Sequence, residues 1–472
     1  MTRRTILLFL LSLLLIIPPK PAAAQTPTPG SGPIYIVQEG DTLWSIALRF
    51  NITVDELIAA NPDINPNLLS VGQELVIPGL EGIQGILRTE TIALGDTFRG
   101  LMRRTQADVD ILQRLNHLVS PTELYVGASF IIPERENATP LTPRGVLAPG
   151  ESLLELAVRA ESDPWALTRF NDLEGTWAAI PGDVLYAPAS ENEGENTVGT
   201  LPPVFASAEV GPLPLKQGGT AEIRVRLAQP ATLSGLLVDK PLHFFPLQGD
   251  TYVALQGVHA MLEPGPYPMR LEATLEDGST QAFEQMVLVV SGNYPKDPPL
   301  IVDPETIDPS VTEPEEELIR SLVEAATPTR WWEDIFASPA SLYPEQNCFT
   351  SRYGNRRSYN GGPYDRFHTG LDFCGGEGLP ITAPAPGIVV FAGPLTVRGN
   401  ATIIDHGWGV YSGFWHQSEI RVQVGEQVET GQVIGLVGGT GRVTGAHLHW
   451  EIWVNGVQVD PMDWLEEKFP HD

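Results

Sequence analysis

The spacing of apolar residues near the N-terminus predicts a small unit of two strands and two helices. A short apolar strand at 35–37 leads into a turn, and residues at helical spacing follow: Leu43, Ile46, Ala47 and Phe50. Thr53 and Glu56 have the spacing of a capping box, which predicts the start of a second helix. The stretch 75–78 (LVIP) then has the character of a closing strand, so the expected order is β-α-α-β.

This pattern recurs twice, each time after 55 residues. Four landmarks keep that interval: Gly40, Gly95 and Gly150; Asn61, Asn116 and Asn171; Gly72, Gly127 and Gly182; and Pro78, Pro133 and Pro188. Unrelated loops would not hold four landmarks in register, so the chain contains an internal repeat. We expect three units, at 34–79, 89–134 and 146–189. Pro- and Gly-containing linkers are expected at 79–88, 134–146 and 189–203.

Residues 204–292 change to a period of two, which is typical of half-buried strands. The alternation is clear in 222–227 (EIRVRL) and 270–275 (RLEATL), and Gly- and Pro-containing turns separate such stretches. Short strands at this spacing predict an all-β immunoglobulin-like sandwich. It contains no catalytic constellation, so we expect it to act as a spacer or to orient the substrate.

Residues 293–340 are predicted to be an acidic, Pro-rich linker followed by a short helix. The helix is expected over 315–326, with one apolar side formed by Leu318, Ile319, Leu322 and Val323. Trp331 and Trp332 follow it and are expected to pack on the last domain. An alternative is that this segment lies over the active-site cleft as a lid.

The first residues have the features of a signal peptide for export. Arg3 and Arg4 precede an apolar run over 6–17, and a small-residue site at 22–24 follows, so we expect cleavage after Ala24. An uncleaved signal that tethers the chain to a membrane is the alternative. No later stretch is apolar enough to span a bilayer.

The net charge of −29 at pH 7 argues against binding to nucleic acid or to anionic lipid. No feature of the sequence predicts an oligomeric state. The only two cysteines are Cys348 and Cys374, and export would permit a disulfide between them. Two free thiols, or two additional metal ligands, are the alternatives.

Four histidines and an aspartate lie within about eighty residues near the C-terminus, and they are the strongest chemical signal in the chain. They are His368, Asp372, His416, His447 and His449. On a strand, His447 and His449 would point to the same face. Converging imidazoles with a carboxylate form a ligand set of the kind that binds zinc. The alternative without a functional site is a strand that carries two surface histidines.

The first repeat closely resembles a LysM domain in the stretch 35–47 (YIVQEGDTLWSIA), in Asn61 and in the final Ile77-Pro78. The resemblance implies two helices on one side of a two-stranded sheet, and binding to glycans that contain N-acetylglucosamine. The later units depart from the pattern at Phe98 and at 150–152 (GES). We expect them to keep the fold, and either to bind glycan or to serve as spacers.

Residues 345–465 resemble the catalytic domain of the lysostaphin/LytM-type zinc endopeptidases that cut peptidoglycan peptides. The matching stretches include 351–354 (SRYG), 368–373 (HTGLDF), 400–409 (NATIIDHGWG) and 431–451. The resemblance implies a mostly antiparallel β fold, with the site in a groove on a sheet.

The resemblance also implies residue roles. His368, Asp372 and His449 match the zinc ligands, and three ligands leave a fourth position open for water. His416 and His447 match two further histidines of the family that are not ligands. We expect His447 to be the general base or to orient the water, and His416 to stabilise the intermediate or protonate the leaving amine, although these two roles could be exchanged. Phe414-Trp415 replaces the usual sequence before His416, which is expected to alter the peptide that fits.

The sequence therefore predicts an exported, multidomain zinc endopeptidase. LysM units are expected to hold it on wall glycan while the last domain cuts peptide stems or cross-bridges of peptidoglycan. The main alternative is a non-enzymatic wall-binding protein that regulates or activates other wall hydrolases. A second alternative is a wall-binding protein with an incidental metal site.

Overall fold

The computed structural model describes residues 32–80, 82–120, 123–134, 139–188 and 201–471. The predicted signal peptide at 1–24 and most of the 189–203 linker lie outside these residues. None of the described helices is long and apolar enough to cross a membrane. The chain divides into two compact units, with the boundary between Leu87 and Arg88.

The first unit is formed by β1 (Ile34–Ile36), α1 (Leu43–Arg49), α2 (Val54–Ala60) and β2 (Glu74–Val76). β1 and β2 pair antiparallel, and their centres, Tyr35 and Leu75, are fully buried. The predicted capping box at α2 is present, because Thr53 and Glu56 each bond the other's backbone N–H. Such a box satisfies two backbone donors that the first turn would otherwise leave unpaired.

Two further segments repeat this order farther along the chain. They are β3 (Ile86–Thr91), α3 (Phe98–Thr105), α4 (Val109–Asn116) and β4 (Ser129–Glu134), then β5 (Leu141–Val146), α5 (Leu153–Arg159), α6 (Pro164–Phe170) and β6 (Val184–Pro188). The predicted β-α-α-β order is confirmed. However, β5 occupies 141–146, where a linker was expected. Pro143 and Gly145 obscured its alternation, and the ladder is irregular between them.

The repeated asparagine joins the end of the second helix to the closing strand in every segment. The Asn171 amide donates to the carbonyls of Leu167 and Tyr186 at 2.7 and 2.6 Å, and its oxygen accepts from the Tyr186 N–H at 2.8 Å. Asn61 and Asn116 make the equivalent three bonds. The 55-residue interval therefore preserves one hydrogen-bond pattern.

Replacing Asn171 by alanine is expected to destabilise the third segment by about 2–3 kcal/mol, because it leaves buried backbone groups without partners. Hydrogen exchange of α6 and β6 in the full chain would measure this as faster exchange. Exposed Glu174, replaced by alanine, is the control and should leave these rates unchanged. Equal exchange in both variants would contradict the proposed stabilising role of the asparagine.

Residues 205–290 form two sheets around one hydrophobic core. The strands are β7 (Phe205–Gly211), β8 (Leu215–Lys216), β9 (Thr220–Leu227), β10 (Ala231–Leu237), β11 (Lys240–Pro241), β12 (Phe245–Gln248), β13 (Thr251–Gly257), β14 (Gly265–Leu275) and β15 (Thr280–Val290). One sheet has the order β11-β10-β14-β15-β8 and the other β12-β13-β9-β7. Ile223 and Val225 of one sheet share a buried cluster with Leu271 and Val287 of the other.

The C-terminal part is built on an eight-stranded sheet. Its elements are β16 (Phe349–Ser351), β17 (Arg356–Arg357), β18 (Arg366–Phe367), β19 (Leu371–Phe373), β20 (Pro380–Thr382), β21 (Gly387–Leu395), β22 (Gly399–Gly407), β23 (Val410–Gln417), β24 (Glu419–Ile420), β25 (Gln427–Val428), β26 (Val433–Leu436), β27 (Leu448–Val454), β28 (Val457–Val459) and α8 (Pro461–Glu466). The sheet has the order β16-β19-β27-β23-β22-β21-β25, with β28 beside β27. Neighbouring strands of this sheet pair antiparallel, as predicted.

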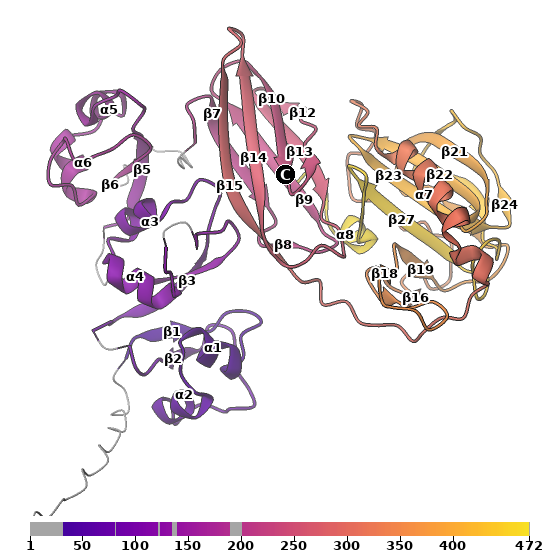
Figure 1. Cartoon of the computed structure of the whole chain (residues 1–472), viewed down its shortest axis with the longest axis horizontal. Coiled ribbons are helices and arrows are strands. Elements are labelled where there is room, and N and C mark those ends of the chain that lie inside the picture. The colour runs from indigo at the N-terminus through magenta and orange to yellow at the C-terminus, as the bar shows by residue number, and fades with distance from the viewer. Residues whose placement is uncertain (1–31, 81, 121–122, 135–138, 189–200, 472) are drawn as a thin grey trace, which may run out of the picture. The chain divides into compact units, whose positions relative to one another are not determined.

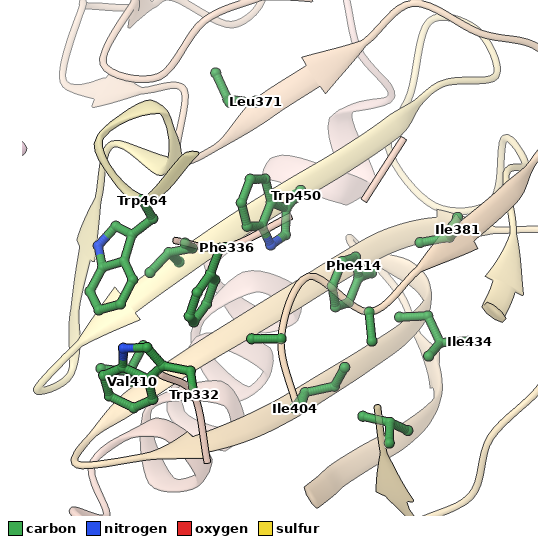
Figure 2. Packing of buried hydrophobic residues seen from close by; sticks show 14 of the residues in the cluster. Trp332, Phe336, Leu371, Ile381, Ile404, Val410, Phe414, Ile434, Trp450 and Trp464 are labelled. Carbon is green, nitrogen blue, oxygen red and sulfur yellow. The ribbon is translucent and has the colours of Figure 1, made fainter. Parts of the chain in front are cut away.

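Trp332 and Phe336, from the end of the segment 293–340, are part of the main core beneath this sheet. Figure 2 shows both rings beside Trp464, and the Trp332 ring centroid lies 5.8 Å from that of Trp464. The Trp332 indole N–H also donates to the carbonyl of Phe469 at 2.6 Å. The prediction that Trp332 packs on the last domain is confirmed, and this tryptophan is not part of a lid.

Helix α7 (Pro309–Val323) covers the other face of the sheet (Figure 1). Ile319 and Val323 pack on Trp415 and Trp453. The helix was expected at 315–326, but Asp308 caps it and it begins at Pro309. Pro314 in its interior suggested an extended linker, yet Pro314 is tolerated because the buried face compensates for one missing hydrogen bond.

A buried carboxylate fixes α7 to the sheet. Glu315 is 6% exposed and accepts hydrogen bonds from the backbone N–H groups of Val397 and Arg398 at 2.8 and 3.1 Å. It also forms an ion pair with the Arg398 guanidinium at 2.9 Å. Such pairing is what a buried charge requires.

The predicted bond between Cys348 and Cys374 is present, with 5.2 Å between their Cα atoms. The bond closes a loop that contains both His368 and Asp372. In the chain-entropy view, closing a loop of this size stabilises the fold by roughly 3 kcal/mol.

Candidate metal centre and groove

Strand β27 has polar, ionisable residues on one face and hydrophobic core residues on the other. Trp450 and Ile452 are fully buried in the main hydrophobic cluster, whereas His449 and Glu451 alternate with them and face the opposite side. β19 pairs with β27 in a register that sets Asp372 directly across from His449. Cross-strand neighbours have their Cβ atoms close together, so these two side chains meet without any loop having to position them.

Three candidate ligands come together at this point. His449 Nδ1 lies 2.7 Å from Asp372 Oδ1, and His368 Nε2 lies 3.0 Å from the same oxygen. The two ring nitrogens are 3.1 Å apart. All three residues are buried, and among the described residues they form the one group with ligand atoms close enough to share a metal ion.

The second nitrogen of each ring fixes its tautomer. His368 Nδ1 lies 2.9 Å from the Arg352 carbonyl, which can only accept, so this nitrogen carries the proton. His449 Nε2 lies 3.0 Å from the Glu451 carboxylate and carries the proton for the same reason. The two remaining nitrogens lie 3.1 Å apart and are the ones left to bind a metal ion.

Two imidazole nitrogens and a carboxylate oxygen at this separation repel one another unless a proton or a metal cation lies between them. The donor set therefore fits a metal ion of the type that accepts imidazole and carboxylate ligands. The outward hydrogen bonds to Glu451 and to the Arg352 carbonyl are those that orient metal-binding histidines in proteins.

The electrostatics of the cluster favour positive charge on His449. Burial lowers the pKa of His449, but hydrogen bonds and charges from Asp372 and Glu451 outweigh burial and raise this pKa to about 9. Burial raises the pKa of Glu451, but its hydrogen bond with His449 brings that pKa down to about 2. A metal ion that binds here would displace a proton, so its affinity should fall as pH falls.

His416 and His447 lie beside this cluster, with their ring centroids 5.3 Å apart. His416 Nδ1 donates to the Thr440 carbonyl at 2.8 Å, which leaves Nε2 free to accept. Burial, then the neighbouring His449 and His447, lower the pKa of His416 to about 3. Its backbone has a left-handed φ of 62°, a costly conformation that clusters at functional sites.

His447 has a different environment. Its Nδ1 lies 2.9 Å from the Gly445 carbonyl, and its Nε2 lies 3.3 Å from Asp372 Oδ1. Both ring nitrogens therefore face oxygens that only accept. The side chain is 19% exposed and lies at the edge of the groove.

A cavity of about 1000 Å³ opens over these five residues. One wall is α7, which contributes Glu316 and Arg320, and another is the loop 442–447. His259 and Met261, from a loop of the two-sheet region, also line it. A cavity of this size has room for several residues of an extended peptide.

Sequence reasoning missed the residues that support the candidate ligands. Glu451 orients His449, and the Thr440 carbonyl orients His416. Arg357 lies 3.7 Å from Asp372 Oδ2. Glu451 could have been found, because it follows His447 and His449 at the same period of two. His406 is buried away from the cluster and bonds the Pro386 carbonyl and Ser412.

Comparison with known proteins identifies two families in separate parts of the chain. Residues 366–461 match peptidase family M23, and residues 35–78 and 91–133 match the LysM domain. The DD-carboxypeptidase/endopeptidase Mpg of Neisseria gonorrhoeae is 43% identical over 97 residues, which is 21% of this chain and 22% of that protein. The peptidoglycan DD-endopeptidase ShyA of Vibrio cholerae is 42% identical over 95 residues, or 20% of this chain and 22% of that protein.

These matches span about a fifth of the length of the curated relatives. Among solved structures, the catalytic domain of lysostaphin from Staphylococcus simulans is 34% identical, with a TM-score of 0.21. That match covers 23% of this chain and 83% of the lysostaphin domain. The C-terminal part of this chain is thus a domain of peptidase family M23, and its N-terminal part carries LysM domains.

Proposed function

We propose that this chain is an exported zinc endopeptidase that cuts peptides of peptidoglycan and is held on wall glycan by its LysM units. The observation that carries the proposal is the meeting of two imidazole nitrogens and a carboxylate oxygen at 2.7–3.1 Å on the floor of a large groove. The M23 match and the peptidoglycan endopeptidases among the relatives support the same activity.

In this proposal His368, Asp372 and His449 hold the metal. A bound zinc ion supplies a Lewis acid, which polarises a carbonyl group and lowers the pKa of a water molecule to about 7. Glu451 keeps the Nε2 proton of His449 in place, so that Nδ1 faces the ion. Arg357 adds positive charge beside the Asp372 carboxylate.

We assign the proton acceptor to His416 and the donor to His447. A neutral His416 with a free Nε2 is suited to accept a proton from the attacking water. Both nitrogens of His447 face acceptors, which suits a ring that donates a proton to the leaving amine. The sequence pointed to the reverse assignment but left the exchange open, and the hydrogen bonds favour the exchange.

The N-terminal segments are proposed to bind glycan. In the first unit Trp44, at the start of α1, and Leu68 and Val71, in the loop before β2, are each at least 67% exposed. In the segment 146–189, Trp165 and Trp177 are 68% and 78% exposed. Exposed indole rings provide flat apolar surfaces that can stack on sugar rings. Such anchoring raises the effective concentration of peptide near the groove.

We further propose that 204–292 is an immunoglobulin-like spacer that helps to orient the substrate. If the two-residue strands β8 and β11 are left out and the others are lettered A to G in chain order, one sheet joins A, B, E and D, and the other joins C, F and G. His259 and Met261 contribute to the groove, which supports the orienting role. The remaining boundaries are proposed to be 293–340 for the linker and helix, and 345–465 for the endopeptidase domain.

Release of new amino groups from purified peptidoglycan sacculi is the direct test. We expect the full chain to release them, a chelator to abolish the release, and added zinc to restore it. Metal analysis should find about one zinc ion per chain. A chain that binds sacculi and zinc but releases no amines would sink the endopeptidase proposal and favour the regulatory alternative. Release that persists in the chelator would refute zinc dependence.

A further inference from the structure

Five arginines line the groove, and only one of them has no acidic partner among the described residues. Arg320 pairs with Glu317 at 2.7 Å, Arg357 with Asp297 at 3.4 Å, Arg366 with Glu316 at 3.8 Å and Arg398 with Glu315 at 2.9 Å. The fifth is Arg442, for which the described residues provide no carboxylate within ion-pair distance. A half-buried cation without a counterion is unusual in a chain whose net charge is −29.

Arg442 is nevertheless held in a defined position. Its backbone N–H donates to the Val397 carbonyl at 2.8 Å, and its Nη1 donates to the Thr306 carbonyl at 2.9 Å. The guanidinium carbon lies 4.7 Å from the centroid of the Tyr359 ring. A guanidinium has five N–H donors, so these contacts orient the group and leave donors for a ligand.

The position of Arg442 connects it to the reacting groups. It lies on the loop that ends at His447, two residues after Thr440, whose carbonyl holds His416. Arg442, His416 and His447 line the same cavity. An anion bound by Arg442 would therefore lie in the groove that also receives the scissile peptide bond.

We propose that Arg442 is a specificity-determining residue that binds a free carboxylate of the peptide substrate, close to the bond that is cut. Guanidinium groups bind carboxylates through two parallel hydrogen bonds, which gives both affinity and orientation. The proposal rests on the proposed endopeptidase function and adds the substrate class, a peptide that carries an unblocked carboxylate. A peptide whose carboxylates are amidated would leave Arg442 without its partner.

The competing explanation is structural, because the bond to the Thr306 carbonyl could serve only to fix the segment before α7. The two explanations differ in their dependence on the substrate. Loss of a structural arginine lowers turnover of every substrate, whereas loss of a carboxylate-binding arginine affects only substrates with the carboxylate. The test therefore varies the enzyme and the substrate together.

The experiment measures kcat/KM of the full, zinc-loaded chain on a cross-linked stem peptide with free carboxylates and on the same peptide with those carboxylates amidated. Wild-type enzyme should prefer the free form by about 10- to 100-fold, the range expected for a hydrogen bond to a charged group. In Arg442→Gln, kcat/KM on the free form should fall by about this 10- to 100-fold factor, while kcat/KM on the amidated form should stay unchanged. Arg442→Lys, which keeps the charge but not the fork, should lie between.

Arg421→Gln is the matched control, since Arg421 is an exposed arginine of the same domain that pairs with Glu419 at 3.2 Å and does not line the groove. It should change neither rate. Equal losses on both peptides in Arg442→Gln, or a wild-type enzyme that does not distinguish them, would overturn the carboxylate-binding role and leave the endopeptidase function intact. A wild-type enzyme that cuts neither peptide would overturn the proposed function itself.

Discussion

Replacing His449 by alanine should remove zinc from the chain and lower the rate of peptide cleavage by at least roughly 10³-fold, because several kcal/mol of transition-state stabilisation depend on the metal. His449 is central to the cluster, since its Nδ1 lies 2.7 Å from Asp372 and 3.1 Å from His368 Nε2. Its loss leaves a single imidazole and a carboxylate, which is too few ligands for a stable site. Metal content after dialysis and amine release from sacculi are the two measurements.

Glu451→Gln is a milder variant that tests the orientation of His449. It keeps every proposed ligand but replaces the carboxylate that accepts the Nε2 proton of His449. Metal affinity should fall by about 10- to 100-fold and be restored by excess zinc. A His449→Ala chain that retains both its zinc and its activity would refute the assignment of this ligand. A Glu451→Gln chain with unchanged affinity would refute only the orienting role.

Trp332→Ala is expected to lower the free energy of unfolding by about 3–5 kcal/mol, the range for deletion of a large buried aromatic ring. The indole is 2% exposed, contacts three other aromatic rings and bonds the Phe469 carbonyl. The change would leave both a cavity and an unpaired carbonyl. Region-resolved hydrogen exchange in denaturant, followed on β22 and β23, reports this domain separately from the rest of the chain.

Trp331→Ala is the matched control. Trp331 is the same residue type one position away but is only partly buried, so we expect a cost of no more than about 1 kcal/mol. Similar losses in the two variants would contradict the assignment of Trp332 to the core. Trp332 also limits how the lid alternative can be tested. A chain that lacks residues 300–340 would lose part of the core, so its activity would not show whether this segment acts as a lid.

Much of the candidate site could be predicted because its residues follow simple periodicities. His447, His449 and Glu451 share one face of a strand, and the pairing of β19 with β27 brings Asp372 opposite His449. Hydrogen bonds to backbone carbonyls could not be predicted, because they depend on how loops fold in space. The bond from His416 to Thr440 is such a case, and our proposal to exchange the roles of His416 and His447 depends on it.

The fold was predictable where local pattern and burial agree. The capping box at Thr53 and the alternation in β9 and β14 are examples. Prediction failed where proline lies inside a regular element, as in α7 and β5. There the packing of the finished domain outweighs the local cost of the proline, and no short stretch of sequence contains that information.

The alternating faces of β27 have a consequence for how such an enzyme can diversify. The same seven residues supply a proposed metal ligand and a central layer of the core, so a substitution that shifts Trp450 or Ile452 also shifts His449. A substitution in this strand that changes thermal stability would therefore also change the geometry of the site. Laboratory selection for new peptide preferences should accordingly accumulate changes in the groove loop 442–447 and on the inner side of α7, while β27 stays unchanged.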